Sequence, residues 1–407
     1  MTKIINFFYL IVLILIHGCN SNVKMKEKEL IIKSKSLAKK FIIADGHIDL
    51  PYRLKEAGYL NKDTVLDLTK DTDGDFDYPK SKRGGLNAPF MSIYIPSEFQ
   101  ESGGAKKLAD SLIDMVIKIT NSFPDKFALA NNPSEIKKNF SKALISLPMG
   151  IENGAAIEKK LENINYFFNR GIRYMTLTHG KNNAICDSSY DSIKTWNGLS
   201  PFGVKVISKM NSVGMMVDVS HVTDDTFYQV IEISKTPVIA SHSSPRKFTP
   251  GFERNMSDDM IKKLAKSNGL ILINFGSSFV SELSNKKFNQ IDRKVENWKI
   301  KNKINDINKI DKFKNKIIEE EEPFASIEDV VNAIDHVVNL VGIDHVGFGS
   351  DFDGVGNTLP YNLKSASDYP NIILELLKKD YSEEDIEKIC YKNLFKTWNE
   401  ILEYSSD

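Results

Sequence analysis

Short apolar segments alternate with longer amphipathic ones from Phe41 onward, and this alternation limits what the chain can fold into. The short segments are rich in β-branched residues and predict strands, whereas the longer ones predict helices. Repeated strand-helix units favour a parallel sheet, because a parallel strand is reached through a crossover. Eight such units predict an α/β fold, a closed (β/α)8 barrel of the TIM type. The predicted strands lie within residues 40–50, 90–96, 143–152, 173–179, 214–221, 236–243, 269–275 and 344–352.

Start and stop signals mark the predicted helices. Residues 200–214, 257–269 and 326–342 each begin at a serine and end on a glycine, as capped helices do. Residues 277–325 interrupt the alternation of predicted strands and helices. They are rich in Lys, Asn and Glu, and they predict an exposed helical insertion. We therefore expect a single catalytic barrel domain over residues 41–407 that carries this insertion.

Composition excludes some classes of function. The chain has 407 residues with 41% hydrophobic content, enough to bury a large core. Its 54 basic and 54 acidic residues balance, so no basic excess indicates a nucleic-acid partner. Cys186 and Cys390 are too few for a disulfide framework, and the sequence leaves open whether they pair.

The N-terminus predicts an export signal over residues 1–18. Its apolar run from Ile4 to Ile16 is shorter than the roughly 20 residues that span a bilayer. The run ends in His-Gly-Cys, which resembles a bacterial lipoprotein signal with Cys19 as the lipidated residue. A membrane-anchored envelope protein is therefore expected, with secretion, an uncleaved anchor or another cleavage point as alternatives. Residues 19–40 are polar and lysine-rich, which is typical of a solvated tether.

Polar residues gather at the C-terminal ends of the predicted strands, where barrels of this type carry their chemistry. Because strand side chains alternate between faces, two residues that are two positions apart share a face and can hold one ion together. Imidazole and carboxylate ligands suit Zn²⁺ or a similar divalent ion, and a carboxylate can bridge two ions. The residues expected at this rim are His47, Asp49, Glu152, His179, His221, His242 and Asp351.

Each of these residues alone also fits an ordinary structural role. His221 can be a helix-entry residue and His242 a turn residue. Four histidines, each at the end of a different strand, nevertheless favour one shared site over four independent structural roles. His336 and His345 are expected to be structural. Asp218, an acid within a buried strand, is a candidate for orienting a metal ligand from behind.

Several motifs also occur in a telling order and spacing. They are DGHIDLP, GIENG, YMTLTHGKNN, GMMVDVSH, PVIASHSS, RNMSDDMIKKLA and VGIDHVGFGSDFDG. In this order they resemble the membrane dipeptidase family of zinc metallopeptidases, also called renal dipeptidase. The likeness runs from about Ile42 to Asn393 and implies a barrel of the metal-dependent hydrolase type.

The resemblance implies a role for each matched residue. His47 and Asp49 match ligands of a first zinc, and His221 and His242 match ligands of a second. Glu152 matches the carboxylate that bridges the two ions.

Other matched residues concern the substrate. His179 matches the residue that contacts the substrate and steadies the tetrahedral intermediate, and Arg254 matches the one that holds the substrate carboxylate. Asp351 matches the acid and base residue, although Asp353 shares its parity along the chain. The implied activity is hydrolysis of dipeptides by a metal-bridging hydroxide, including dipeptides with a C-terminal D-residue.

Two rival functions remain open. One is an amidase or lactonase for another small carboxylated substrate on the same metal core. The other is a lipoprotein that binds peptides without cleaving them, although no ligand is lost and Asp351 is present. After THGKNN the chain reads AICDSSYD where many relatives carry an aromatic residue, so the pocket wall is left open. A homodimer is left open as well.

Overall fold

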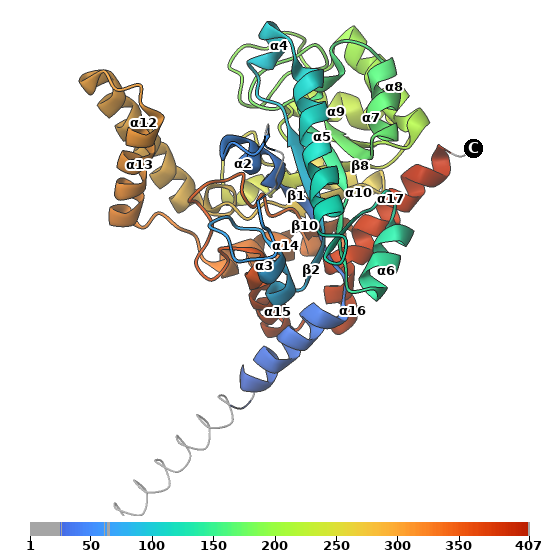
Figure 1. The fold of residues 1–407 in the computed structure, drawn as a ribbon, viewed down its shortest axis with the longest axis vertical. Coiled ribbons are helices and arrows are strands. Elements are labelled where there is room, and N and C mark those ends of the chain that lie inside the picture. Colours follow the sequence, from blue (N-terminus) through green and yellow to red (C-terminus); the bar gives the residue numbers. More distant parts are fainter. Residues whose placement is uncertain (1–24, 26, 61, 63–65, 406–407) are drawn as a thin grey trace, which may run out of the picture.

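The computed structural model describes residues 25, 27–60, 62 and 66–405. Within them, eight parallel strands close into a barrel in the order β1-β10-β9-β8-β7-β6-β5-β2, with helices around it (Figure 1). This confirms the predicted (β/α)8 barrel. The barrel strands are β1 (Ile43–Ile48), β2 (Leu86–Tyr94), β5 (Met149–Glu152), β6 (Ile172–Thr176), β7 (Met216–Asp218), β8 (Val238–Ser243), β9 (Leu270–Ile273) and β10 (Val346–Phe348).

The segment predicted as the third strand is divided into two short strands. β4 (Ile145–Leu147) pairs with β3 (Phe127–Leu129) in a separate two-stranded sheet, and only β5 joins the barrel. Pro148 stands at the break and lacks the N–H group that a continuous ladder would need. Its carbonyl oxygen still accepts a hydrogen bond from the Met91 N–H group at 2.8 Å.

The predicted helices begin where the sequence signals placed them, although α10 (Asp258–Lys266) ends before the glycine expected to end it. Ser200, Ser257 and Ser326 each cap a helix by accepting a hydrogen bond from a backbone N–H group in its first turn. Helices outside the insertion are α2 (Leu50–Glu56), α3 (Tyr78–Gly84), α4 (Phe99–Ser102), α5 (Ala105–Ser122), α6 (Pro133–Ser141), α7 (Glu162–Asn169), α8 (Pro201–Val213), α9 (Asp224–Ile233), α10 (Asp258–Lys266), α14 (Ile327–Val341), α15 (Tyr369–Lys378), α16 (Glu383–Glu387) and α17 (Asn393–Tyr404).

Residues 277–325 form α11 (Ser277–Val280), α12 (Glu282–Asn302) and α13 (Ile307–Glu321). The last two pair as a hairpin that projects away from the barrel (Figure 1). The hairpin has a small apolar core of its own, and near its tip the rings of Trp298 and Phe313 stack with centroids 4.2 Å apart.

The N-terminal segment differs in part from the expected tether. Residues 27–40 form a helix, and Leu37 and Ala38 on it are buried in the main core. The predicted signal segment and Cys19 lie outside the described residues. Among the residues that are described, no helix combines the length and apolar character needed to cross a membrane.

Large apolar side chains close the N-terminal end of the barrel. Phe90 lies inside the barrel, and its ring centroid is 5.3 Å from that of Trp398 on α17 and 5.5 Å from that of Tyr174. This end is therefore filled, and the buried histidine and carboxylate cluster lies at the opposite, C-terminal rim.

Candidate active site

A cavity of about 430 Å³ opens at the C-terminal rim of the barrel. Its walls come from the ends of several strands and from the loops that follow them, as the barrel prediction requires. The polar residues that line it include Asp49, Glu152, His179, His221, Arg254 and Asp351.

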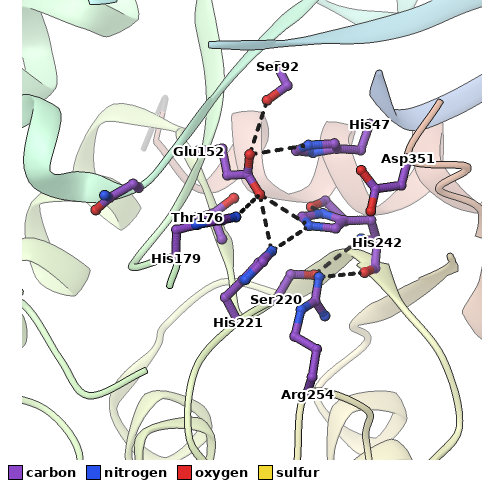
Figure 2. Close-up of polar contacts among 12 residues, drawn as sticks. His47, Ser92, Glu152, Thr176, His179, Ser220, His221, His242, Arg254 and Asp351 are labelled. Atoms are coloured by element: carbon purple, nitrogen blue, oxygen red, sulfur yellow. Dashed lines mark hydrogen bonds and ion pairs between the residues drawn. The ribbon is translucent and has the colours of Figure 1, made fainter. Parts of the chain in front are cut away.

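Glu152, the last residue of β5, lies at the centre of the cluster (Figure 2). Its Oε1 atom is 3.1 Å from His221 Nε2 and 3.3 Å from His242 Nε2. Its Oε2 atom is 3.5 Å from His47 Nε2 and accepts a hydrogen bond from Ser92 Oγ at 3.4 Å. The two oxygens of one carboxylate therefore face different histidines.

Charge on Glu152 is favoured although the side chain is buried. Burial raises the pKa of this carboxyl, but the surrounding His179, His47, His221 and His242 outweigh it and hold the pKa well below its usual value. A carboxylate at this position is the form that binds a cation.

His47 and Asp49 lie together at the end of β1, as their spacing predicted. The Nε2 atom of His47 is 3.3 Å from Asp49 Oδ2, and its Nδ1 atom is 2.9 Å from the hydroxyl of Tyr174. Burial lowers the pKa of His47, but Tyr174, Glu152 and Asp49 raise it by more. Positive charge is therefore favoured at this corner of the site.

His221 and His242 form the other side of the cluster. Their Nε2 atoms are only 2.8 Å apart, so both rings point at the same place. Burial, and then nearby positive groups that include Arg254, hold the pKa of both imidazoles well below its usual value. Neutral imidazole is the form that binds a metal ion.

The donor set fits divalent metal ions. His47 Nε2 and Asp49 Oδ1 are buried and have no hydrogen-bond partner among the described residues. Buried polar atoms are normally paired, and two unpaired buried donor atoms of this kind suit the coordination of a cation. In the described part of the chain, three sets of side chains bring ligand atoms within 4.8 Å of one another: His47, Glu152 and His242; Glu152, His179 and His221; and His47, Asp49 and Asp351.

Two of the predicted substrate residues flank this cluster. His179 is partly exposed, and its Nε2 atom is 3.7 Å from Glu152 Oε1. Arg254 is 3% exposed, with Nη1 donating to Ser243 Oγ at 2.7 Å and Nη2 donating to the carbonyl of His242 at 2.9 Å. Its buried Nε–H group has no partner among the described residues and remains free to donate.

Asp351 stands between the cluster and the open cavity. Its Oδ2 atom accepts a hydrogen bond from Asn274 Nδ2 at 2.8 Å. Burial raises the pKa of this carboxyl to about 7, with His47 acting in the opposite direction. Asp353 is held differently, because its carboxylate lies 3.1 Å from Arg53 Nε and accepts from the backbone N–H of Asp75. Asp351 and Asp353 thus have different polar partners, although their positions along the strand predict the same face for both.

The structure also supplies residues that sequence reasoning missed. Tyr190, within the atypical AICDSSYD segment, lines the cavity with its ring 5.8 Å from that of His221, whereas Cys186 of the same segment is fully buried. Asn274 and Ser241 contact Asp351 and His242, respectively. Ser241 lies within the PVIASHSS motif, and Asn274 lies in a predicted strand, but neither was assigned a role from the sequence.

Comparisons with known proteins agree on one family. Residues 32–407 match the family model described as membrane dipeptidase (peptidase family M19). Dipeptidase tcpJ of Claviceps purpurea is 28% identical over 364 residues, which cover 88% of this chain and 76% of that protein. An uncharacterized dipeptidase of Schizosaccharomyces pombe is 29% identical over 370 residues, with 88% and 80% covered.

Solved structures share the fold. The probable dipeptidase PvdM from Pseudomonas aeruginosa superposes with a TM-score of 0.80 at 24% identity, over 93% of this chain and 99% of that one. A metallopeptidase from Rhodobacter sphaeroides, solved with a phosphinate mimic of the dipeptide L-Ala-D-Ala, superposes with a TM-score of 0.72 at 22% identity. That superposition covers 89% of this chain and 99% of the other.

Proposed function

The chain belongs to the membrane dipeptidase family of metallopeptidases, and from this premise we propose that it hydrolyses dipeptides with two zinc ions at the barrel rim. The observation that carries the proposal is that the two carboxylate oxygens of Glu152 face different histidines. One carboxylate oxygen faces His47, and the other faces His221 and His242. A carboxylate placed in this way can bridge two ions.

The chain supplies a ligand set for each ion. His47, Asp49 and Glu152 Oε2 would hold one, and Glu152 Oε1, His221 and His242 would hold the other. Mixed imidazole and carboxylate donors suit zinc and leave coordination positions open. When bound, two such ions supply an activated water molecule and polarise the scissile carbonyl.

Arg254 sets the length of the substrate. Its planar guanidinium suits a carboxylate, and its Nε–H group has no partner among the described residues. Arg254 lies beside the proposed metal ligands in a cavity of about 430 Å³. A substrate that carries its terminal carboxylate one residue beyond the scissile bond fits this arrangement, which selects dipeptides over longer peptides.

Two residues would handle charge during the reaction. Burial raises the pKa of Asp351 to about 7, and Asn274 donates to its Oδ2 atom. The Oδ1 atom would take a proton from water and pass it to the leaving amine. His179 Nε2, on the exposed side of the cluster, would donate a hydrogen bond to the developing oxyanion.

The test combines metal content with cleavage of a panel of L,L and L,D dipeptides by the full mature chain. The panel includes L-Ala-D-Ala, because the Rhodobacter sphaeroides relative was solved with a mimic of that dipeptide. We expect about two zinc ions per chain and release of free amino acids from the wild type. His242→Ala should lose cleavage and retain at most the ion held by His47, Asp49 and Glu152. The matched control is His336→Gln, because His336 contacts Asp258 on the outside of the barrel.

Each other outcome has a clear meaning. Bound metal without cleavage of any dipeptide would favour the amidase or lactonase alternative. A chain that binds no zinc would overturn the ligand assignment.

We further propose that the chain is exported and held at a membrane by a lipid on Cys19. The apolar run before this cysteine and the small residue next to it support the proposal. Labelling cells with a clickable fatty acid should mark the wild type but not Cys19→Ser. An unlabelled wild type would contradict the anchor.

A further inference from the structure

The buried carboxylate of Asp218 is linked to His242 through a single hydroxyl group. Ser241 Oγ lies 2.6 Å from Asp218 Oδ2 and 2.7 Å from His242 Nδ1. We propose that Asp218 and Ser241 are positioning residues, which fix the tautomer of His242 so that its Nε2 lone pair faces the metal position. The inference rests on the proposed function only in taking His242 as a metal ligand.

The surroundings of Asp218 determine which groups donate. Asp218 and Ser241 are fully buried, and Asp218 Oδ1 accepts from the backbone N–H groups of Ser220 at 3.1 Å and Ser241 at 2.8 Å. Oδ2 accepts from the hydroxyls of Thr176 at 2.5 Å and Ser241. A carboxylate can only accept hydrogen bonds, so the Ser241 hydroxyl must donate its single hydrogen to Asp218 Oδ2.

The direction of this hydrogen bond determines which ring nitrogen of His242 carries the proton. Since the Ser241 proton points at Asp218, Ser241 Oγ can only accept from His242 Nδ1, and that nitrogen must therefore carry a proton. A neutral imidazole protonated at Nδ1 has its lone pair at Nε2, the atom 3.3 Å from Glu152 Oε1. The chain of donors thus presents the correct atom before any ion arrives.

The other two histidines proposed as metal ligands, His47 and His221, lack this control. His47 Nδ1 faces the hydroxyl of Tyr174, which can either donate or accept. His221 Nδ1 has no hydrogen-bond partner among the described residues. Among the three proposed histidine ligands, His242 is thus the one whose tautomer is set by a buried carboxylate, acting through Ser241.

An alternative is that Asp218 only joins β7 to β8 through the backbone N–H groups it accepts. Asp218→Asn separates the two roles. The backbone donors would keep the amide oxygen in place of Oδ1, so the amide NH₂ group would replace Oδ2 and donate to Ser241 Oγ. The Ser241 proton would then turn to His242 Nδ1 and force the Nε2–H tautomer, which cannot bind the ion.

The first measurement is ¹⁵N NMR of histidine-labelled, metal-free full-length protein at pH 8, where the chemical shifts distinguish the two tautomers. Only seven histidines contribute, and His242→Ala identifies the signal of residue 242. The second measurement is zinc affinity, by competition with a chromophoric chelator. Thr176→Val is the matched control, because it removes the other hydroxyl from the same carboxylate oxygen without touching His242.

We expect the Nδ1–H tautomer at His242 in the wild type and in Thr176→Val, and the Nε2–H tautomer in Asp218→Asn. Zinc affinity should fall by about 10- to 100-fold in Asp218→Asn and stay near the wild-type value in the control. If Asp218→Asn does not fold, Ser241→Ala should give mixed tautomers and a similar loss of affinity.

Two results would overturn the inference. One is an unchanged tautomer in Asp218→Asn or, where that variant does not fold, in Ser241→Ala. The other is an equal loss of affinity in Thr176→Val, which would indicate a purely structural carboxylate. A wild type with the expected tautomer but no zinc binding would instead contradict the proposed function.

Discussion

Replacement of Arg254 by methionine tests how the site recognises its substrate. The guanidinium has one buried donor, Nε–H, without a partner among the described residues, and a substrate carboxylate would accept from it. A hydrogen bond between charged groups at a buried site contributes about 1.5 to 3 kcal/mol. At about 1.4 kcal/mol per tenfold change in rate, its loss lowers kcat/KM by about 10- to 150-fold.

Methionine should leave the framework of the site in place. The two atoms that accept from Arg254 keep other partners, since the His242 carbonyl also accepts from Asn274 and Ser243 Oγ also pairs with Ser220 Oγ. Metal content of the variant should therefore match that of the wild type. A variant that loses its metal would show that Arg254 also supports the ligands.

The assay compares a dipeptide with its C-terminal amide in both proteins. The wild type should prefer the free acid by the same 10- to 150-fold, and Arg254→Met should cleave the two substrates at similar rates. The comparison cancels general losses, because both substrates share the scissile bond. A variant that keeps the wild-type preference for the acid would refute the assignment of Arg254 to the substrate carboxylate.

Further predictions concern the metal, the thiols and the insertion. Glu152→Gln removes the charge that both ligand groups share, so metal content should fall below one ion per chain by elemental analysis; two retained ions would contradict the bridging role. A chelator should lower the thermal midpoint in calorimetry, because an ion at 100 times its Kd stabilises the folded state by about 2.7 kcal/mol. Cys186 and Cys390 are free and buried, with pKa values raised by burial, so they should react with a thiol reagent only after denaturation. Replacing residues 293–316 with a short linker should leave kcat/KM within about twofold, since they form the distal part of a hairpin that projects away from the barrel. A larger loss would link the hairpin to catalysis.

Much of the fold could be predicted from the sequence because its signals are local. The strands of the barrel are apolar runs and the helices carry serine caps, so each element can be recognised without its neighbours. The break at Pro148 could not be predicted from local sequence, because it depends on the pairing of β4 with β3. β3 itself is not marked by a long apolar run. Burial of Leu37 likewise depends on the surface against which residues 27–40 pack.

The site could be predicted only as a set of residue types. Strand parity placed His47 with Asp49, and the family motifs chose Asp351 over Asp353. The polar contacts that distinguish the residues are nonlocal, since Asn274, just after β9, donates to Asp351, and Arg53 on α2 pairs with Asp353. A single sequence does not reveal such pairs.

Backbone conformation explains how several side chains reach one point. Asn153, His221 and Asp351 have φ values of 84°, 71° and 63°, in the left-handed region that residues other than glycine rarely adopt. Each lies just past the end of a barrel strand, where extended backbone would carry the chain straight out of the rim. The left-handed turn instead redirects the chain at the rim, at a cost of about 1 to 3 kcal/mol per residue. Surrounding structure must offset that cost: the carbonyl of His221 accepts from Ser189, and Asn153 Nδ2 donates to the carbonyl of Ile95. Strain at these three strand ends, absent from any periodicity in the sequence, therefore helps to bring His221 and Asp351 to the rim, whereas His47, Glu152 and His242 reach it from within their strands.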